Sequence, residues 1–148
     1  MEESEGVCAY ATMIQPVHRT NKTELTIPVL DAYISEFDHE PYSIAIGAYD
    51  AIYHLKAAIE AVQSLNATEI INHWETWTCD NPRLGAGGKY AWWPQTHDLV
   101  TGHPYMYNLC TQWQPDGTKI VTQGFGNYDD SLATGNYTVA PWVHSAWL

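Results

Sequence analysis

The sequence predicts an α/β fold, because it combines a long helical repeat of apolar residues, two further helical segments and a hairpin of alternating residues. Over residues 41–63, apolar side chains recur at intervals of three and four, which is the spacing of one helix face. We expect a buried helix here, with Ser43 capping its start. The apolar positions are Ile44, Ala48, Ala51, Ile52, Leu55, Ala58, Ile59 and Val62.

The segments on either side of this helix carry weaker signals of the same kind. Residues 6–17 are typical of a strand, and residues 23–37 of a helix with a proline in its first turn. Asn66 and Glu69 fit a capping box, which predicts another helix after them. A glycine-dense turn should then lead into a short strand at residues 89–93.

The hairpin lies towards the end of the chain. Residues 105–114 alternate in side-chain type, Pro115-Asp116-Gly117 is a turn sequence, and residues 118–123 form the returning strand. Residues 124–148 show no period, and we expect an irregular tail there.

Composition limits the function classes. At 148 residues the chain has the size of one domain. Its net charge is −11 with only six Lys and Arg, so it lacks the basic surface that nucleic-acid binding needs. Three Asn-x-Thr sequons, at Asn21, Asn66 and Asn136, favour an extracellular glycoprotein. Cys8, Cys79 and Cys110 leave open one disulfide with a free thiol or three buried thiols.

The candidates for catalysis and cofactor binding are few. His97-Asp98 and His103 could share a metal or form an acid–base pair, but bonds to backbone around a loop are the favoured interpretation. The glycines at 85–88 do not make a phosphate loop, because Arg83 stands where its first glycine should be and Tyr90 where a Ser or Thr should bind magnesium. The sequence therefore predicts no enzyme, no metal and no cofactor.

Several segments together resemble a known family, the type I periplasmic or extracellular solute-binding proteins of ABC importers, which receive branched-chain amino acids and amides. The segments that carry the resemblance, in this order, are Gln15–His18, Leu30–Tyr33, Tyr49–Ala51 with the helix after it, Arg83–Trp93, Thr96–Asp98 and Gln112–Gly117. The resemblance implies the C-terminal part of a two-lobed receptor, with helices on a parallel sheet plus a β-hairpin. Residues 1–98 would form a lobe-one-like part, and residues 99–148 the hinge and second-lobe hairpin with the tail.

The resemblance also implies a function: binding of a small polar solute for import, without catalysis. Ile46 would be an apolar wall of the ligand cleft, Tyr49 would pack beneath it or offer its hydroxyl, and Gln15 and His18 could reach the cleft mouth. Asp50 would bond neighbouring backbone. The implied partners are the importer's membrane subunits and either a missing N-terminal half or further copies of this chain. The implied location is the periplasm, the extracellular space or the cell surface.

Two other functions remain open from the residues themselves. The sequons and the surplus of aromatic residues, seven Trp and ten Tyr, suit an extracellular self-assembling or structural glycoprotein. The aromatic residues alone also suit a carbohydrate-binding module, in which exposed rings would form a platform for sugars. The rings in question are Trp92, Trp93, Trp113, Trp142 and Trp147.

Overall fold

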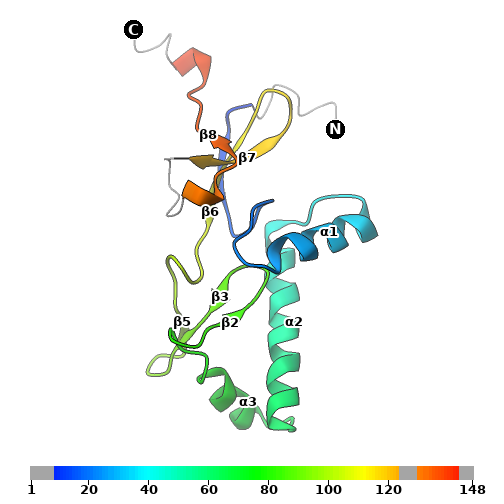
Figure 1. The fold of residues 1–148 in the computed structure, drawn as a ribbon, viewed down its shortest axis with the longest axis vertical. Coiled ribbons are helices and arrows are strands. Elements are labelled where there is room, and N and C mark those ends of the chain that lie inside the picture. The colour runs from blue at the N-terminus through cyan, green and yellow to red at the C-terminus, as the bar shows by residue number, and fades with distance from the viewer. Residues whose placement is uncertain (1–8, 124–129, 144–148) are drawn as a thin grey trace. The chain divides into compact units, whose positions relative to one another are not determined.

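The computed structural model describes residues 9–123 and 130–143 and has a mixed α/β structure (Figure 1). The chain divides into two compact units, which we name the sheet unit (residues 1–20 and 108–148) and the helical unit (residues 21–107). In the sequence, the helical unit is inserted between the two segments of the sheet unit. No helix in the described residues is long and apolar enough to cross a membrane.

In its described residues, the sheet unit contains four strands in the order β1-β6-β7-β8. Strand β1 (Thr12–Gln15) is antiparallel to β6 (Leu109–Trp113), which forms a hairpin with β7 (Lys119–Gln123). Strand β8 (Gly135–Asn136) then pairs with β7 in parallel. The expected hairpin is confirmed, with a first strand shorter than expected. The expected parallel sheet is not confirmed. Among the described strands the sheet is mixed, and only the pair β7–β8 is parallel.

A buried glutamine joins distant segments of the sheet unit. Gln112 Nε2 donates to the carbonyl oxygens of Tyr10 (3.1 Å) and Thr138 (2.8 Å), and Gln112 Oε1 accepts from the Thr138 N–H (2.9 Å). Because these buried polar atoms are paired, burying the amide carries little penalty. The end of the chain is therefore not simply an irregular tail. It supplies β8 and a 3-10 turn at Asp130–Leu132.

The helical unit contains three α-helices and two short hairpins. The helices are α1 (Thr26–Phe37), α2 (Ser43–Val62) and α3 (Ala67–Trp74). Strand β2 (Arg83–Leu84) pairs with β3 (Lys89–Tyr90), and β4 (Trp92–Trp93) pairs with β5 (Asp98–Leu99), both antiparallel. The single strand expected at residues 89–93 is thus split at Ala91 between two hairpins.

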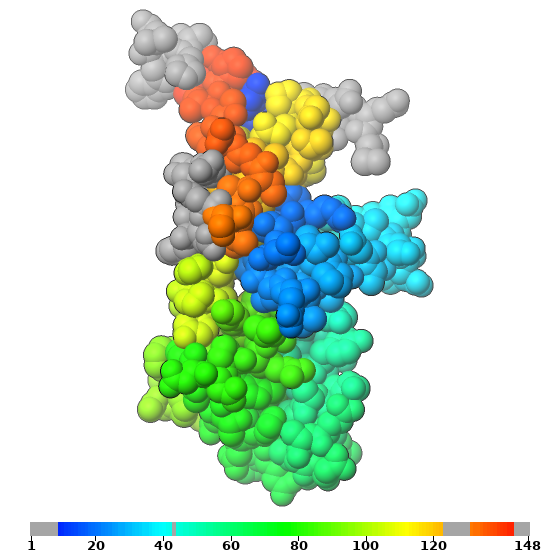
Figure 2. Space-filling model, viewed as in Figure 1, coloured from blue at the N-terminus to red at the C-terminus, as the bar shows by residue number. Residues whose placement is uncertain are grey.

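Helix α2 has the predicted length but is not the buried helix that its sequence predicted. Its buried side chains lie four residues apart, on one narrow stripe. Ile44 and Ile52, on other faces, are 81% and 65% exposed, and Figure 2 shows α2 at the outer surface of its unit. The apolar period correctly predicted a helix, but the described residues cover only one side of it. The stripe consists of Ile46, Asp50, His54 and Ala58.

The helix ends explain where each element begins and stops. Tyr42 keeps an extended backbone, so it takes the N-cap position of α2 and Ser43 is already helical, contrary to the expected cap. Helices α1 and α2 end at Asp38 and Gln63, which adopt the left-handed conformation (φ 56° and 53°). Each of these two residues donates its N–H to a carbonyl four residues back.

The start of α3 confirms half of the predicted capping box. Asn66 Oδ1 accepts from the Thr68 N–H at 2.9 Å, as expected of an N-cap. The N–H of Asn66 donates to Ser64 Oγ at 3.1 Å instead of to Glu69. Ser64 therefore takes the place that the capping box gives to Glu69.

Candidate functional site

The loop at residues 85–88, between β2 and β3, is held by a buried carboxylate on α2. Asp50, 1% exposed, accepts from the N–H groups of Ala86 (2.7 Å) and Gly87 (2.8 Å) and from the Tyr90 hydroxyl (2.9 Å). Burial and the Asp50 charge raise the pKa of Tyr90, so this hydroxyl remains a donor. Asp50 bonds backbone, as the resemblance implied, but backbone 36 and 37 positions further along the chain.

The carbonyl groups of the same loop are bound from the other side. Thr23 Oγ1 donates to the Gly85 carbonyl at 2.7 Å, and Thr26 Oγ1 donates to the Ala86 carbonyl at 2.8 Å. Lys22 Nζ completes the set with a 2.6 Å bond to the Gly87 carbonyl. Two loop N–H groups already bind Asp50, so they are not available to a phosphate, in agreement with the sequence argument.

Two glycines of the loop are required by close approach. A Cβ on Gly85 would lie 2.6 Å from Asp50 Oδ2, closer than such contacts allow. Gly88 has φ +153°, and a Cβ there would lie 2.7 Å from Met106 Sδ.

Lys22 also joins the two ends of the helical unit. Its Nζ donates to the Tyr107 carbonyl at 2.6 Å and lies 4.4 Å from the centre of the Tyr107 ring. Burial lowers the pKa of Lys22 to about 8, against the opposing effect of Asp50, which favours the charged form.

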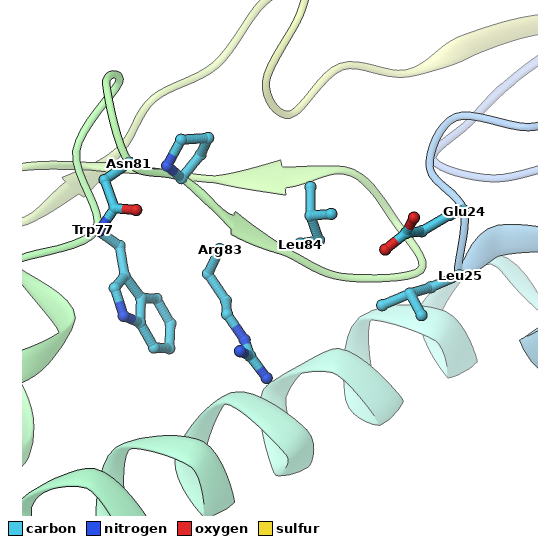
Figure 3. A pocket seen from close by; sticks show the side chains of 7 residues that line it. Glu24, Leu25, Trp77, Asn81, Arg83 and Leu84 are labelled. Carbon is cyan, nitrogen blue, oxygen red and sulfur yellow. The ribbon is translucent and has the colours of Figure 1, made fainter.

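A cavity of about 410 Å³ lies beside β2, within the size range of ligand pockets. The bond from Thr23 to the loop places the next two residues, Glu24 and Leu25, beside β2. Figure 3 shows the Arg83 side chain between Trp77 and Leu84, with the Glu24 carboxylate turned towards Leu84. The lining consists of Glu24, Leu25, Trp77, Asn81, Pro82, Arg83 and Leu84.

The cavity brings one cation and one anion to an aromatic wall. Neither Arg83 nor Glu24 makes a side-chain hydrogen bond or ion pair within residues 9–123 and 130–143. The His54 ring lies 5.3 Å from that of Trp77, and burial lowers the pKa of His54, with Arg83 acting in the same direction and Asp50 against it. His54 is therefore neutral at pH 7. The charges of the lining balance, which suits a small zwitterion or an amide.

The residues that the resemblance placed at the ligand are distributed over both units. Ile46 is 3% exposed, with its Cγ2 3.7 Å from the Cβ position of Gly87, so it is not an open wall for a solute in this structure. Tyr49 is exposed on α2, and its ring lies 4.4 Å from that of Tyr53. Neither residue is among those that line the cavity beside β2.

Gln15 and His18 lie in the sheet unit, and both contact one lysine. Gln15 Oε1 accepts from Lys119 Nζ at 3.0 Å, and His18 Nε2 lies 2.8 Å from the Lys119 carbonyl oxygen. The structure thus brings these two predicted residues together at β7.

His97, a candidate for a pair with Asp98 that the sequence left as the less favoured alternative, contacts a glutamate. His97 Nδ1 lies 2.6 Å from Glu75 Oε1, and this contact joins the β4–β5 turn to the end of α3. Within the described ranges, no group of His, Cys, Asp and Glu is arranged to hold a metal. Cys79 carries a free thiol and Cys110 is buried in β6, while Cys8 lies outside the described residues.

The other surface candidates are scattered. Asn21, Asn66 and Asn136 all have exposed side chains. The proposed sugar-platform residues have separate neighbours: Trp92 stacks with Trp74, Trp113 lies under the Lys119 ammonium, and Trp142 packs on Tyr10. Trp147 lies outside the described residues.

Comparisons with protein-family models, with characterised proteins and with solved structures found no match. The cavity residues Glu24, Trp77 and Arg83 were not predicted as a site. One signal was present, since Arg83 is among only six basic residues and directly follows an Asn-Pro turn. Nothing in the sequence placed Glu24 beside it.

Proposed function

We propose that this chain binds a small polar solute, an amino acid or amide, as the C-terminal part of a type I solute receptor of an ABC importer. The observation that carries the proposal is the cavity beside β2, where Arg83 and Glu24 flank apolar surface. A guanidinium binds a carboxylate through two parallel hydrogen bonds, and a carboxylate binds an ammonium group. An amino acid carries both groups, and an amide offers a donor and an acceptor to the same pair.

The partner in this proposal is the rest of the receptor. Tyr42, Ile44 and Ile52 are large apolar residues on α2 or at its start, and all three are more than half exposed. A helix with apolar residues on more than one face is typical of one that is covered on more than one side. An N-terminal half would supply that cover, and the importer's membrane subunits would receive the solute outside the cytoplasm, in the periplasm or at the cell surface.

The binding proposal is tested by isothermal titration calorimetry of the purified chain with leucine, glutamine and acetamide. We expect saturable binding of at least one of these solutes. Replacing Arg83 by Gln should weaken binding of an amino acid about tenfold or more, since charge-assisted hydrogen bonds contribute about 1.5–3 kcal/mol each. Glu24→Gln should have a similar effect on amino acids and a smaller one on acetamide.

Matched controls lie on the exposed side of α2. Lys56 and Glu60 form a surface ion pair at 3.0 Å, and both side chains are well exposed. Lys56→Gln and Glu60→Gln repeat the two charge changes away from the cavity and should leave the affinity unchanged. The proposal fails if no amino acid or amide binds, or if Lys56→Gln weakens binding as much as Arg83→Gln.

A second candidate is self-assembly through α2, which its exposed apolar residues also favour. Ile52→Glu places a charge at the middle of that surface. If the chain is a stable oligomer by light scattering and Ile52→Glu makes it monomeric, copies of this chain cover α2 in place of a receptor half. A monomer at all concentrations would rule this candidate out.

A further inference from the structure

A second cavity, of about 280 Å³, shares no lining residue with the β2 cavity, although Trp74 of this cavity and Trp77 of the β2 cavity have ring centres 6.5 Å apart. Ile71, Trp74 and Glu75 reach it from one face of α3, because their spacing of three and four residues brings them to the same side of a helix. Trp92 of β4 and His97 of the following turn complete the lining.

The walls of this cavity are mainly indole rings. Trp74 and Trp92 are nearly parallel, at 20°, with ring centres 6.3 Å apart. The faces of indole rings carry negative potential and attract cations more strongly than those of other aromatic side chains. No Lys or Arg lines the cavity, and the histidine of the lining, His97, contacts Glu75.

The polar side of the cavity is a carboxylate. One oxygen of Glu75, Oε1, contacts His97 Nδ1, while Oε2 accepts no hydrogen bond in the described part of the chain. His97 is held in the left-handed conformation (φ 59°), and its N–H donates to the Trp93 carbonyl at 2.8 Å. The turn therefore fixes the imidazole beside the carboxylate and leaves one carboxylate oxygen available.

From this arrangement we propose that the cavity binds a small organic cation, an alkylated or quaternary ammonium group. Its methyl groups would contact the indole faces, and its charge would be balanced by Glu75. The chain's net charge of −11 raises the local concentration of cations around it. This site is separate from the solute cavity at Arg83 and does not depend on that proposal.

A saccharide fits the same cavity less well. Sugar hydroxyls need several hydrogen-bonding partners in addition to an aromatic surface, because each unpaired buried hydroxyl is costly. The lining offers the Glu75 and His97 side chains, which already contact each other, and two indole N–H groups. Of these, Trp74 Nε1 donates to the His54 carbonyl at 3.4 Å, and Trp92 Nε1 is buried. The charge complementarity favours a cation.

The test compares choline with 3,3-dimethylbutan-1-ol, its neutral analogue of the same shape, by calorimetry and tryptophan fluorescence. Choline should bind about tenfold or more tightly than the neutral analogue. Glu75→Gln should remove most of this preference. His97→Gln should strengthen choline binding, because it leaves both carboxylate oxygens to the ligand. These two substitutions change the polar groups while leaving the indole walls in place.

The controls use neighbours that do not line the cavity. Glu69→Gln on α3 and Trp93→Leu on β4 should leave choline binding unchanged, and so should Arg83→Gln, which separates this site from the solute cavity. Equal binding of choline and its neutral analogue, binding of cellobiose with no binding of choline, or no binding at all would each overturn the proposal.

Discussion

Replacing Asp50 by Ala should destabilise the helical unit more than any change on the exposed side of α2. The substitution leaves two buried backbone N–H groups and the part-buried Tyr90 hydroxyl without their acceptor. Each unsatisfied buried donor costs about 1–3 kcal/mol, and relief of the buried negative charge offsets part of the sum. We expect a loss of about 3–5 kcal/mol in the free energy of unfolding.

Asp50→Asn should lower the free energy of unfolding by less, about 2 kcal/mol. Its amide oxygen can still accept from one or two of the three donors, whereas its NH₂ group faces a remaining donor. The measurement is urea unfolding followed by tryptophan fluorescence, with the midpoint and slope compared among variants. Glu60→Ala is the matched control on the same helix, and it should change stability by less than about 0.5 kcal/mol, as expected for a surface ion pair.

Hydrogen exchange supplies a local readout of the same prediction. The amide protons of Ala86 and Gly87 should be protected in the wild type and should exchange much faster in Asp50→Ala. The reasoning is refuted if Asp50→Ala unfolds at the wild-type urea concentration, or if those two amides keep their protection.

Three further outcomes follow from the geometry. Gly47→Ala should stabilise by up to about 1 kcal/mol, since Gly47 lies in a helix and a Cβ there meets nothing within 4 Å; Gly85→Ala should cost about 1–3 kcal/mol, because its Cβ would overlap Asp50. Relative to the wild type, the urea midpoint should shift upward in Gly47→Ala and downward in Gly85→Ala. Shifts in the same direction would contradict the packing described for these two glycines. In the unfolded chain Lys22 keeps its proton up to about pH 10.5 but in the fold only to about 8, so stability should rise between these values. Over this pH range the free energy of unfolding should rise by about 1–2 kcal/mol more in the wild type than in Lys22→Met, after allowance for partial exposure. If the free energy of unfolding changes with pH in parallel in the two proteins, the lysine is not buried. Asp38→Gly should raise the melting temperature, because it relieves the left-handed backbone and removes a negative charge from a helix C-terminus; an unchanged or lower melting temperature would count against this.

The elements that could be predicted from the sequence are those specified by neighbouring residues. The bounds of α2 followed from its period, and the β6–β7 hairpin followed from alternation around Pro115-Asp116-Gly117. The pairing of Thr12 with Gln112 could not be predicted in this way, because it joins residues far apart in the chain. Nor could β8, since a strand of two residues leaves no period.

Burial was the property that periodicity predicted least well. The period showed which residues of α2 share a face, but it could not show which face meets the rest of the chain. The buried stripe contains two polar residues, Asp50 and His54, whereas Ile44 and Ile52 remain exposed. Asp50 is buried because of donors supplied by the loop after β2, a relation between distant residues that a local pattern does not contain.

The candidate site was missed for the same reason. Glu24 and Arg83 are far apart in sequence, and the bond from Thr23 to the Gly85 carbonyl brings their segments together. No spacing rule links a threonine before a helix to a glycine after a strand. The functional family inferred from the sequence stays a prediction, and the charged cavity gives it a specific test.

The bond from Lys22 to the Tyr107 carbonyl has a consequence for how the protein can be made and divided. This bond joins residues at the two ends of an inserted segment, so the first and last residues of the segment 21–107 lie next to each other. We therefore expect that this segment can be expressed alone, or reconnected with new termini, without cutting through its packed interior. On the ribosome it can fold as soon as residue 107 emerges, while β1 must wait for β6 to be synthesised before it has a neighbour to pair with.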